Sequence, residues 1–280
     1  MSRTVDCFYP GQSFPSISIT GAECSLNCRH CSKKYLEGMI PATSPEDLLD
    51  VSEALAERGA RGFLLSGGVD ARGKVPLLAF VPAIREVKSS TDLRINAHVG
   101  LTPRDELESL VESGIDSFSV DLYGDDKTIH EVLGLDANAD DYFQVFETLK
   151  ELGASVSPHV CIGIHGGRLT GEAQVISRLR SSNPKTLIFI SLIPTKGTEY
   201  AGVAPPSREM MASVIRQART ELAGTKLLLG CMRSKSDRSW EFELIEAGLD
   251  GIVLPAANTV ERLRAAGYSV RKRPECCALL

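Results

Sequence analysis

The sequence has 280 residues, of which 43% are apolar and 24% charged, and its formal net charge at pH 7 is −5. This balance is ordinary for a soluble protein with a full core, and the lack of a Lys/Arg block argues against nucleic acid as a partner. No apolar run reaches the roughly 18 residues that a membrane span needs, and the first residues lack the apolar centre of a secretory signal. We therefore expect a cytoplasmic protein that does not act at a membrane.

Short apolar or β-branched runs alternate with amphipathic stretches along the whole chain. In chain order, the predicted strands are Ser16–Thr20, Gly62–Ser66, Leu93–Ala97, Ser117–Leu122, Val156–Gly163, Thr186–Leu192, Lys226–Leu229 and Gly251–Leu254. Helical patterns lie between them. In one of these, Pro45–Arg58, Ser44 is the expected N-cap, and Gly59 follows where a left-handed residue commonly ends a helix.

Eight strands that alternate with helices predict an α/β fold in which a parallel sheet closes into a (β/α)8 barrel of the TIM type. We expect residues 1–280 to form a single barrel domain, with residues 268–280 as a tail that folds back on the barrel. An incomplete (β/α)6 barrel with an extension is the first alternative. An open doubly wound sheet is the second.

The chain contains eight cysteines, although a cytosolic protein has little use for disulfides. Metal binding is therefore the first explanation to consider. The set comprises Cys7, Cys24, Cys28, Cys31, Cys161, Cys231, Cys276 and Cys277. The sequence suggests no role for Cys7.

Three of these cysteines, Cys24, Cys28 and Cys31, form a C-x3-C-x2-C pattern after the first predicted strand. Thiolates at this spacing can bind three irons of a cubane, and no fourth cysteine follows nearby. One iron then keeps an open position, as substrate-binding metal chemistry requires, whereas electron-transfer clusters usually have four cysteine ligands. The alternatives are a zinc site, with His30 or a distant cysteine as fourth ligand, and plain buried thiols.

This loop resembles the signature of the radical S-adenosylmethionine (SAM) superfamily. The resemblance implies that Cys24, Cys28 and Cys31 hold a [4Fe-4S] cluster whose remaining iron chelates SAM. An electron from a donor such as ferredoxin or flavodoxin then cleaves SAM to a 5′-deoxyadenosyl radical, which abstracts hydrogen from an unactivated carbon. By the same resemblance, His30 packs near the adenine; a solvated loop histidine is the alternative.

Gly67 and Gly68 follow the second predicted strand, and glycine lets the backbone approach a ligand closely. They resemble the Gly-Gly-Glu element with which the family binds the amino group of SAM. The sequence departs from that element because Val69 replaces the acidic residue and Asp70 stands one position later, which puts the carboxylate role in doubt. A simple turn is the alternative.

Polar residues also end the third and fourth predicted strands, at the rim where barrel enzymes place their chemistry. Asp121 resembles the family position that contacts the ribose or methionyl part of SAM, and a loop-capping aspartate is the alternative. Asn96 and His98 are similar candidates.

The fifth predicted strand resembles a Val-Cys-x-Gly stretch of biotin synthase, in which the cysteine ligates a second cluster. The resemblance implies that Cys161 binds such a cluster and that Ile162 and Ile164 line the adenine pocket. Cys231 or Arg233 occupies a place comparable to an arginine ligand of biotin synthase.

The vicinal pair Cys276-Cys277 lies in a polar tail that gives it no reason to be buried. With Cys161 and Cys231, the pair would supply four thiolates for an auxiliary [4Fe-4S] cluster. Small buried hydrophobic residues are the alternative for Cys161 and Cys231.

Within the biotin synthase-like branch, the chain is most similar to the two-component lipoyl synthases of archaea and some bacteria. The similarity rests on strings such as Phe14-Pro-Ser-Ile-Ser-Ile-Thr-Gly, Leu229-Gly-Cys-Met-Arg and Glu275-Cys-Cys-Ala-Leu. It implies lipoate biosynthesis, in which sulfur is inserted into an octanoyl chain on a lipoyl-carrier or H-type protein, with a paralogous radical SAM subunit as partner. A maturase or methylating enzyme and a non-enzymatic iron–sulfur module remain the alternatives.

Overall fold

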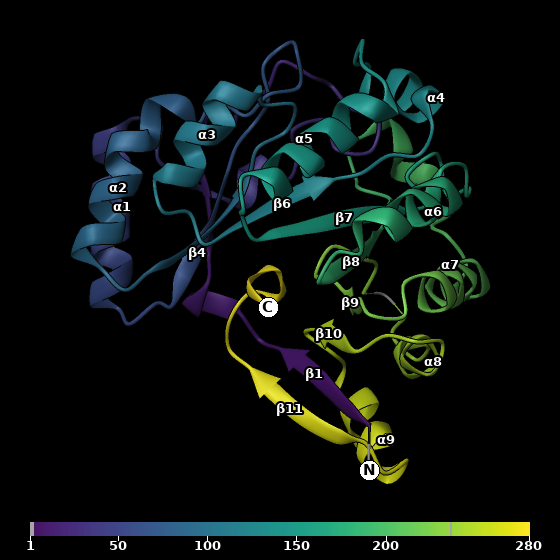
Figure 1. Cartoon of the computed structure of the whole chain (residues 1–280). Coiled ribbons are helices and arrows are strands. Elements are labelled where there is room, and N and C mark those ends of the chain that lie inside the picture. Colours follow the sequence, from purple (N-terminus) through teal and green to yellow (C-terminus); the bar gives the residue numbers. More distant parts are fainter. Residues whose placement is uncertain (1–2, 236) are drawn as a thin grey trace.

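The structure, a computed structural model, describes residues 3–235 and 237–280. Its centre is a curved sheet of parallel strands, with most helices along the outer side (Figure 1). The strands are β1 Thr4–Phe8, β2 Ser16–Ser18, β3 Ile40–Pro41, β4 Gly62–Ser66, β5 Arg94–His98, β6 Ser117–Asp121, β7 Val156–Ile162, β8 Thr186–Ser191, β9 Lys226–Leu229, β10 Gly251–Val253 and β11 Ser269–Arg273.

The α-helices are α1 Pro45–Glu57, α2 Val81–Ser90, α3 Arg104–Glu112, α4 Asp126–Thr128, α5 Ala139–Glu151, α6 Glu172–Ser182, α7 Arg208–Glu221, α8 Glu241–Glu246 and α9 Ala257–Ala265. Shorter turns are η1 Gly11–Ser13, η2 Leu36–Gly38, η3 Leu78–Phe80, the π-helical η4 Ile129–Leu133, η5 Glu199–Gly202 and η6 Cys277–Leu279. None of the described helices is long and apolar enough to span a membrane.

The eight predicted strands are all present, with ends that differ by at most two residues. The predicted start of α1 is also confirmed: Ser44 Oγ accepts a hydrogen bond from the Asp47 N–H at 3.1 Å, and the Asp47 carboxylate accepts one from the Ser44 N–H at 3.0 Å. Gly59 ends this helix with φ at +73°, a conformation that glycine adopts without strain. The short strands β1, β3 and β11 were not predicted.

The barrel prediction is confirmed in its incomplete form. The sheet order is β11-β1-β10-β9-β8-β7-β6-β5-β4-β2-β3. A closed eight-stranded barrel would pair β2 with β10, but β1 takes that place beside β10 and β11 pairs with the other side of β1. In the described chain, β3 and β11 therefore each pair with a strand on one side only, and they form the two edges of an open barrel.

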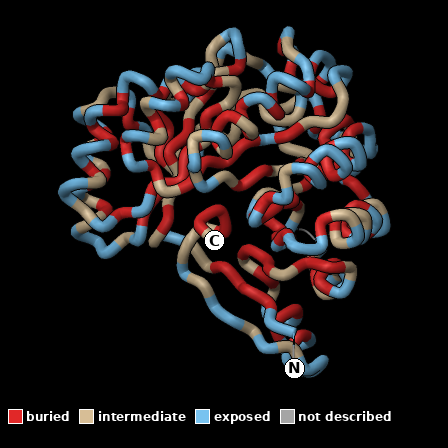
Figure 2. Tube along the Cα trace, viewed as in Figure 1, coloured by how far each residue is buried: buried red, intermediate tan, exposed pale blue. Residues whose placement is uncertain are grey.

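Alternate residues of each strand point to opposite sides of the sheet, which gives the molecule two apolar cores. The larger lies between the sheet and the helices, where buried residues run along the strands (Figure 2). The smaller core lies inside the barrel and contains Phe8, Ile188, Leu228 and Val253 together with Cys277 and Ala278 of η6.

The C-terminal tail thus folds back on the barrel and enters it, so that its end lies within the curve of the sheet (Figure 1). Ser117 Oγ and Ser157 Oγ donate hydrogen bonds to the Ala278 carbonyl at 2.7 and 3.1 Å. Because Ser117 is the first residue of β6 and Ser157 the second of β7, η6 reaches the end of the barrel opposite the carboxyl ends of the strands.

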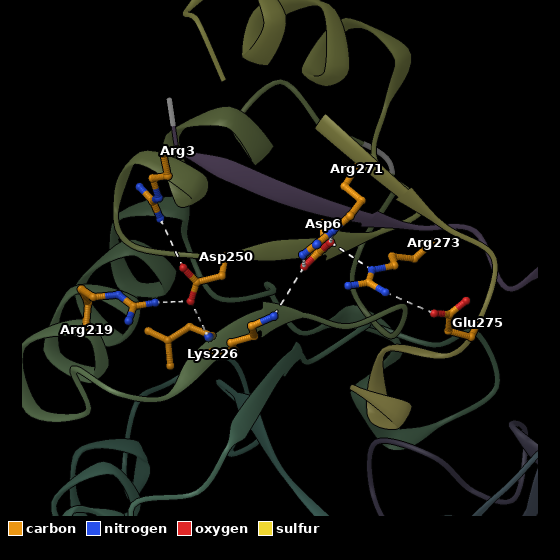
Figure 3. Close-up of polar contacts among 9 residues, drawn as sticks. Arg3, Asp6, Arg219, Lys226, Asp250, Arg271, Arg273 and Glu275 are labelled. Carbon is orange, nitrogen blue, oxygen red and sulfur yellow. Dashed lines mark hydrogen bonds and ion pairs between the residues drawn. The ribbon is translucent and has the colours of Figure 1, made fainter. Parts of the chain in front are cut away.

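Ion pairs hold the β1–β11 edge in place (Figure 3). The buried Asp6 on β1 accepts hydrogen bonds from Arg271 Nε at 2.5 Å, Arg271 Nη2 at 2.9 Å and Arg273 Nε at 3.1 Å. Burial opposes ionisation, but the two arginines outweigh it and lower the pKa of Asp6. A second carboxylate, Asp250, pairs with Arg219.

Candidate functional site

The three-cysteine loop follows β2 and is fastened first to the loop after β4. The Val69 N–H donates to Cys24 Sγ at 3.4 Å, and the Ser25 N–H donates to the Val69 carbonyl at 2.8 Å. Gly68 adds a hydrogen bond from its N–H to Thr20 Oγ1 at 2.7 Å. The Gly-Gly turn therefore positions Cys24 from the neighbouring strand.

The same loop is also fastened to two segments much later in the chain. The Arg29 N–H donates to the Val132 carbonyl of η4 at 2.9 Å, and the Tyr200 N–H donates to the Arg29 carbonyl at 3.1 Å. Tyr35 and Thr195 share a hydrogen bond between their hydroxyls at 3.0 Å. Contacts from η4 and from the 195–200 segment thus fix the loop at the carboxyl ends of the strands.

Cys28 and Cys31 are joined by a tight turn, in which the Cys31 N–H donates to the Cys28 carbonyl at 3.0 Å. Ser32 and Lys33 continue it with φ at +43° and +65°, a region that non-glycine residues seldom occupy and that is enriched at functional sites. Such a conformation persists only where surrounding contacts hold it, as the contacts described above do for this loop.

The thiols of this loop influence one another. Burial, followed by the nearby Cys31 and Cys24, raises the pKa of Cys28 to about 12. Three partly exposed thiols from one loop are a donor set that fits an iron–sulfur cluster. Across residues 3–235 and 237–280, no three His, Cys, Asp or Glu side chains already form a metal site. Ligation by Cys24, Cys28 and Cys31 therefore stays a prediction.

His30 lies within the loop, between Cys28 and Cys31, and its buried Nδ1 has no hydrogen-bond partner among the described residues. Burial lowers the pKa of His30 to about 4, so the ring is neutral at pH 7. Buried polar atoms normally have partners, and an orphaned one calls for a ligand or water. The position of His30 is compatible with the predicted adenine contact, which stays a prediction.

Asp121, Asn96 and His98 lie at or near the carboxyl ends of β6 and β5. Asn96 and Ser119 exchange hydrogen bonds at 3.0 and 3.1 Å, which occupies the buried amide of Asn96. Asp121 is exposed, and the described residues form no hydrogen bond or ion pair with its carboxylate. Asp121 is thus better placed than Asn96 to contact a ligand, and its role with SAM stays a prediction.

On β7, Cys161 and Ile162 point to opposite sides of the sheet. Cys161 is paired in register with Ile190, which packs against the inner core, whereas Ile162 is fully buried in the helix-side core. Ile164 is also buried in that core. Ile164 and Cys161 line a small cavity of about 10 Å³ beside Tyr123 and Thr128. The adenine contacts of Ile162 and Ile164 stay predictions.

Of the remaining cysteines, Cys231 lies near Cys276 and Cys277 of the tail. Burial and the nearby Cys276 raise the pKa of Cys231. A hydrogen bond between Cys276 and Cys277 lowers the pKa of the former and raises that of the latter. Cys161 is influenced instead by burial and by the charges of Asp121 and Glu172. Within the described residues, the four thiols do not form one ready-made set, and the auxiliary cluster stays a prediction.

Arg233 is engaged elsewhere. Its guanidinium donates to Glu241 Oε1 at 2.7 Å and to the Gly230 carbonyl at 2.7 Å, and both charged side chains are fully buried. This ion pair fixes the start of α8. The guanidinium of Arg233 is therefore occupied by this ion pair. Its position does not support the role of cluster ligand that the resemblance to biotin synthase suggests.

His159 on β7 is not among the site residues predicted from the sequence. Its ring meets that of His98 edge to face, with 5.9 Å between the ring centroids. Burial lowers the pKa of both imidazoles, that of His159 to about 4. The signal was present in the alternation Ser157, His159, Cys161, which gives one face of a strand three polar residues.

A family model described as Radical SAM superfamily matches residues 18–179. The biotin synthase of Syntrophotalea carbinolica is 24% identical over 196 residues, which are 68% of this chain and 59% of that protein. The biotin synthase of Wolinella succinogenes is 21% identical over 242 residues, covering 85% of this chain and 86% of that protein. The chain therefore spans about three fifths of the length of the first relative and most of the second.

Solved structures with the same fold include the FeFe-hydrogenase maturase HydG from Carboxydothermus hydrogenoformans. It is 20% identical with a TM-score of 0.66, and the match covers 95% of this chain and 67% of HydG. Methylornithine synthase, PylB, is 16% identical with a TM-score of 0.62, and the match covers 96% of this chain and 83% of PylB. At these identities the likeness is one of fold.

Proposed function

We propose that this chain, which belongs to the radical SAM superfamily, inserts sulfur into a protein-bound octanoyl chain as one component of a lipoyl synthase pair. Its family implies a [4Fe-4S] cluster and SAM, and its biotin synthase homologues suggest a sulfurtransferase. The proposal adds to this the substrate, an octanoylated lipoyl-carrier or H-type protein. It also adds a paralogous radical SAM subunit and a ferredoxin or flavodoxin as electron donor.

The observation that carries the proposal is a second group of thiols inside or beside the barrel. The tail brings Cys277 into the inner core, and Cys231 lies near enough to Cys276 for their charges to interact. Cys161 lies on β7 in register with Ile190 and packs against the larger core. A single SAM cluster needs none of these cysteines. A sacrificial auxiliary cluster that donates sulfur needs thiolate ligands of its own.

When bound, the cluster and SAM supply a 5′-deoxyadenosyl radical able to remove hydrogen from an unactivated carbon. The chain's own residues do the positioning. Cys24, Cys28 and Cys31 would hold the cluster, and the contacts from Val69, η4 and the 195–200 segment hold the loop in place.

The experiment is anaerobic reconstitution followed by reaction with SAM, a reductant and an octanoylated H-type carrier. We expect about eight irons per chain, the content of two cubanes, together with 5′-deoxyadenosine and a carrier whose mass has increased by sulfur. SAM cleavage with about four irons and no sulfur transfer would favour a maturase or methylating enzyme. Iron binding without SAM cleavage would favour a non-enzymatic module.

The Cys28→Ala variant tests the first cluster. We expect it to lose reductive SAM cleavage and about four irons per chain, because two thiols of one loop cannot hold the cubane. Cys7→Ala is the matched control, since Cys7 is fully buried in the helix-side core. Wild-type yields of 5′-deoxyadenosine from Cys28→Ala would end the assignment of this loop.

A further inference from the structure

The π-helical segment η4 holds the three-cysteine loop from above the strand ends. The Val132 carbonyl of η4 accepts the Arg29 N–H at 2.9 Å, and the Leu133 carbonyl accepts the Cys28 thiol at 3.6 Å. Iron ligation would remove that thiol proton, so the bond from Arg29 is the contact that persists in the loaded protein. π-Helical turns are rare and frequently mark functional sites. The position of η4 therefore sets the position of the loop.

A buried histidine in turn holds η4. His165, in the loop after β7, is 5% exposed. Its Nδ1 lies 3.0 Å from Oγ1 of Thr128, the residue immediately before η4. Its Nε2 lies 3.4 Å from Oε2 of Glu131, the third residue of η4. One imidazole ring thus joins η4 to the loop that follows β7.

The hydrogen bonds of Thr128 decide where His165 carries a proton. Burial opposes ionisation of Asp125, but hydrogen bonds from Thr128 and Thr170 outweigh it and lower the pKa of that carboxyl. An ionised carboxylate only accepts, so the single hydroxyl proton of Thr128 goes to Asp125 Oδ2 at 2.7 Å. Towards His165 the Thr128 oxygen can then only accept, and Nδ1 must carry a proton.

The other nitrogen of the ring faces a carboxylate. In a neutral ring protonated at Nδ1, Nε2 of His165 is an acceptor and sets its lone pair against Glu131 Oε2. A second proton, on Nε2, turns this contact into an ion pair. The Glu131 side chain is 45% exposed, so solvent can supply and remove that proton. A doubly protonated ring therefore fits these partners better than a neutral one.

The remaining charged groups around the ring do not oppose a positive charge there. Asp125 adds a second carboxylate on the far side of Thr128. Glu172, at the start of α6, accepts hydrogen bonds from two backbone N–H groups of the β7–α6 loop. Lys127 lies 3.9 Å from Glu131, and Arg168, whose N–H donates to the carbonyl of the neighbouring histidine, is exposed. Three carboxylates thus face two exposed cations.

From this geometry we infer that His165 is a positioning residue for the three-cysteine loop, which it holds through η4 as an imidazolium between Thr128 and Glu131. The protonated ring donates on both sides and joins η4 to the β7–α6 loop. When the pH rises and Nε2 loses its proton, the attraction to Glu131 is lost and η4 is released on that side. The inference goes beyond the proposed function, because it concerns the loop and is independent of the substrate.

The test is the rate at which iron passes from the reconstituted full chain to an added chelator at pH 6 and pH 8, across the range in which histidine titrates. Glu131→Gln keeps the length of the side chain and can donate an amide N–H to Nε2 of a neutral ring, so its hold on η4 should not depend on pH. We expect the ratio of the rate at pH 8 to the rate at pH 6 to be roughly tenfold larger in the wild type than in Glu131→Gln.

Two further variants complete the comparison. His165→Asn keeps only the donor at the Nδ1 position, so it should release iron fast at both pH values. His130→Asn changes an exposed histidine of η4 itself and is the matched control, with rates equal to those of the wild type.

A second measurement reads the ring directly and does not need the cluster. In the full chain with 15N-labelled histidine, assigned with His165→Asn, both ring nitrogens of His165 should be protonated at pH 6. Equal rate ratios in the wild type and Glu131→Gln, wild-type iron release from His165→Asn, or a singly protonated ring at pH 6 would each overturn the inference. The proposed function fails separately, by the absence of sulfur in the product.

Discussion

Gly68 lies directly against Cys24: a Cβ on Gly68 would stand 2.6 Å from the Cβ of Cys24 and 2.0 Å from the carbonyl oxygen of Glu23. Real Cβ atoms do not approach so closely, and the backbone of the cluster loop leaves no room for one. By resemblance to the family, Gly67 and Gly68 are predicted to lie against SAM. The structure shows a packing reason for glycine at this position, because the backbone of the cluster loop at Glu23 and Cys24 leaves no room for a side chain on Gly68.

Gly68→Ala should therefore displace the cluster loop. We expect the variant to bind fewer than half the wild-type irons of the SAM cluster, with a much smaller change in the midpoint of thermal unfolding, because the strain is confined to one loop. Iron content after reconstitution and the unfolding midpoint of the apoprotein are the measurements. Gly38→Ala is the control, since a Cβ there meets nothing within 4 Å. Full iron content in Gly68→Ala would show that the loop can shift without consequence.

Replacing Cys276 and Cys277 together by serine tests the auxiliary cluster. We expect iron to fall from about eight to about four per chain, because serine is a poor ligand for iron–sulfur clusters, while SAM cleavage persists. Sulfur transfer to the octanoyl carrier should disappear. An iron content that is the same in the double variant and the wild type would remove the tail from the ligand set.

The hydrogen bonds from Ser117 and Ser157 to Ala278 should hold the tail inside the barrel. Replacing both serines by alanine leaves a buried carbonyl unpaired, which we expect to lower the free energy of unfolding by about 1–3 kcal/mol. Hydrogen exchange at residues 277–280 should become faster than elsewhere. Ser213→Ala, on the exposed side of α7, is the control. Unchanged exchange in the tail would mean that the inner apolar core alone retains it.

Asp6 should make stability depend on acid pH. Its pKa in the folded chain is lowered from 3.8, because Arg271 and Arg273 outweigh the effect of burial. A carboxyl whose pKa is depressed by folding stabilises the fold above its unfolded pKa, and that contribution is lost as the pH falls through the folded pKa. The apoprotein should therefore lose stability below about pH 4.

In Asp6→Asn this part of the pH dependence should vanish, and at pH 7 the variant should be less stable by roughly 1–3 kcal/mol. Urea unfolding between pH 3 and pH 7, with the exposed Asp92→Asn as control, measures both effects. If Asp6→Asn keeps the acid dependence of the wild type, other carboxylates are its source.

The eight predicted strands could be found from sequence because each is a short apolar run whose helix-side residues are buried. The strand β11 could not, because Ser269–Arg273 is mostly charged and largely exposed. Among the described strands it pairs only with β1, at the other end of the chain. A pairing over such a distance leaves no local pattern. This edge is also what takes the place of β2 and leaves the barrel open.

The cluster loop was evident from cysteine spacing alone, but its anchors at Val69, Val132 and Tyr200 come from three distant segments. The contact between His98 and His159 was equally hidden. Their strands are separated by β6, and no periodicity tells which inward residues of two non-adjacent strands meet across a curved sheet. The spacing of residues within one loop can be read from the sequence. Which residues of separate strands meet depends on the curvature of the sheet.

The pairing of β1 with β11 joins residues such as Asp6 and Arg271, which are 265 positions apart. Closing so long a loop costs entropy that is recovered only after the intervening units have folded and brought the two ends together. This edge is therefore expected to be the slowest part of the sheet to appear during refolding. It should also be the first to open in the native protein, so the two ends of the chain would report on the progress of folding in its central units.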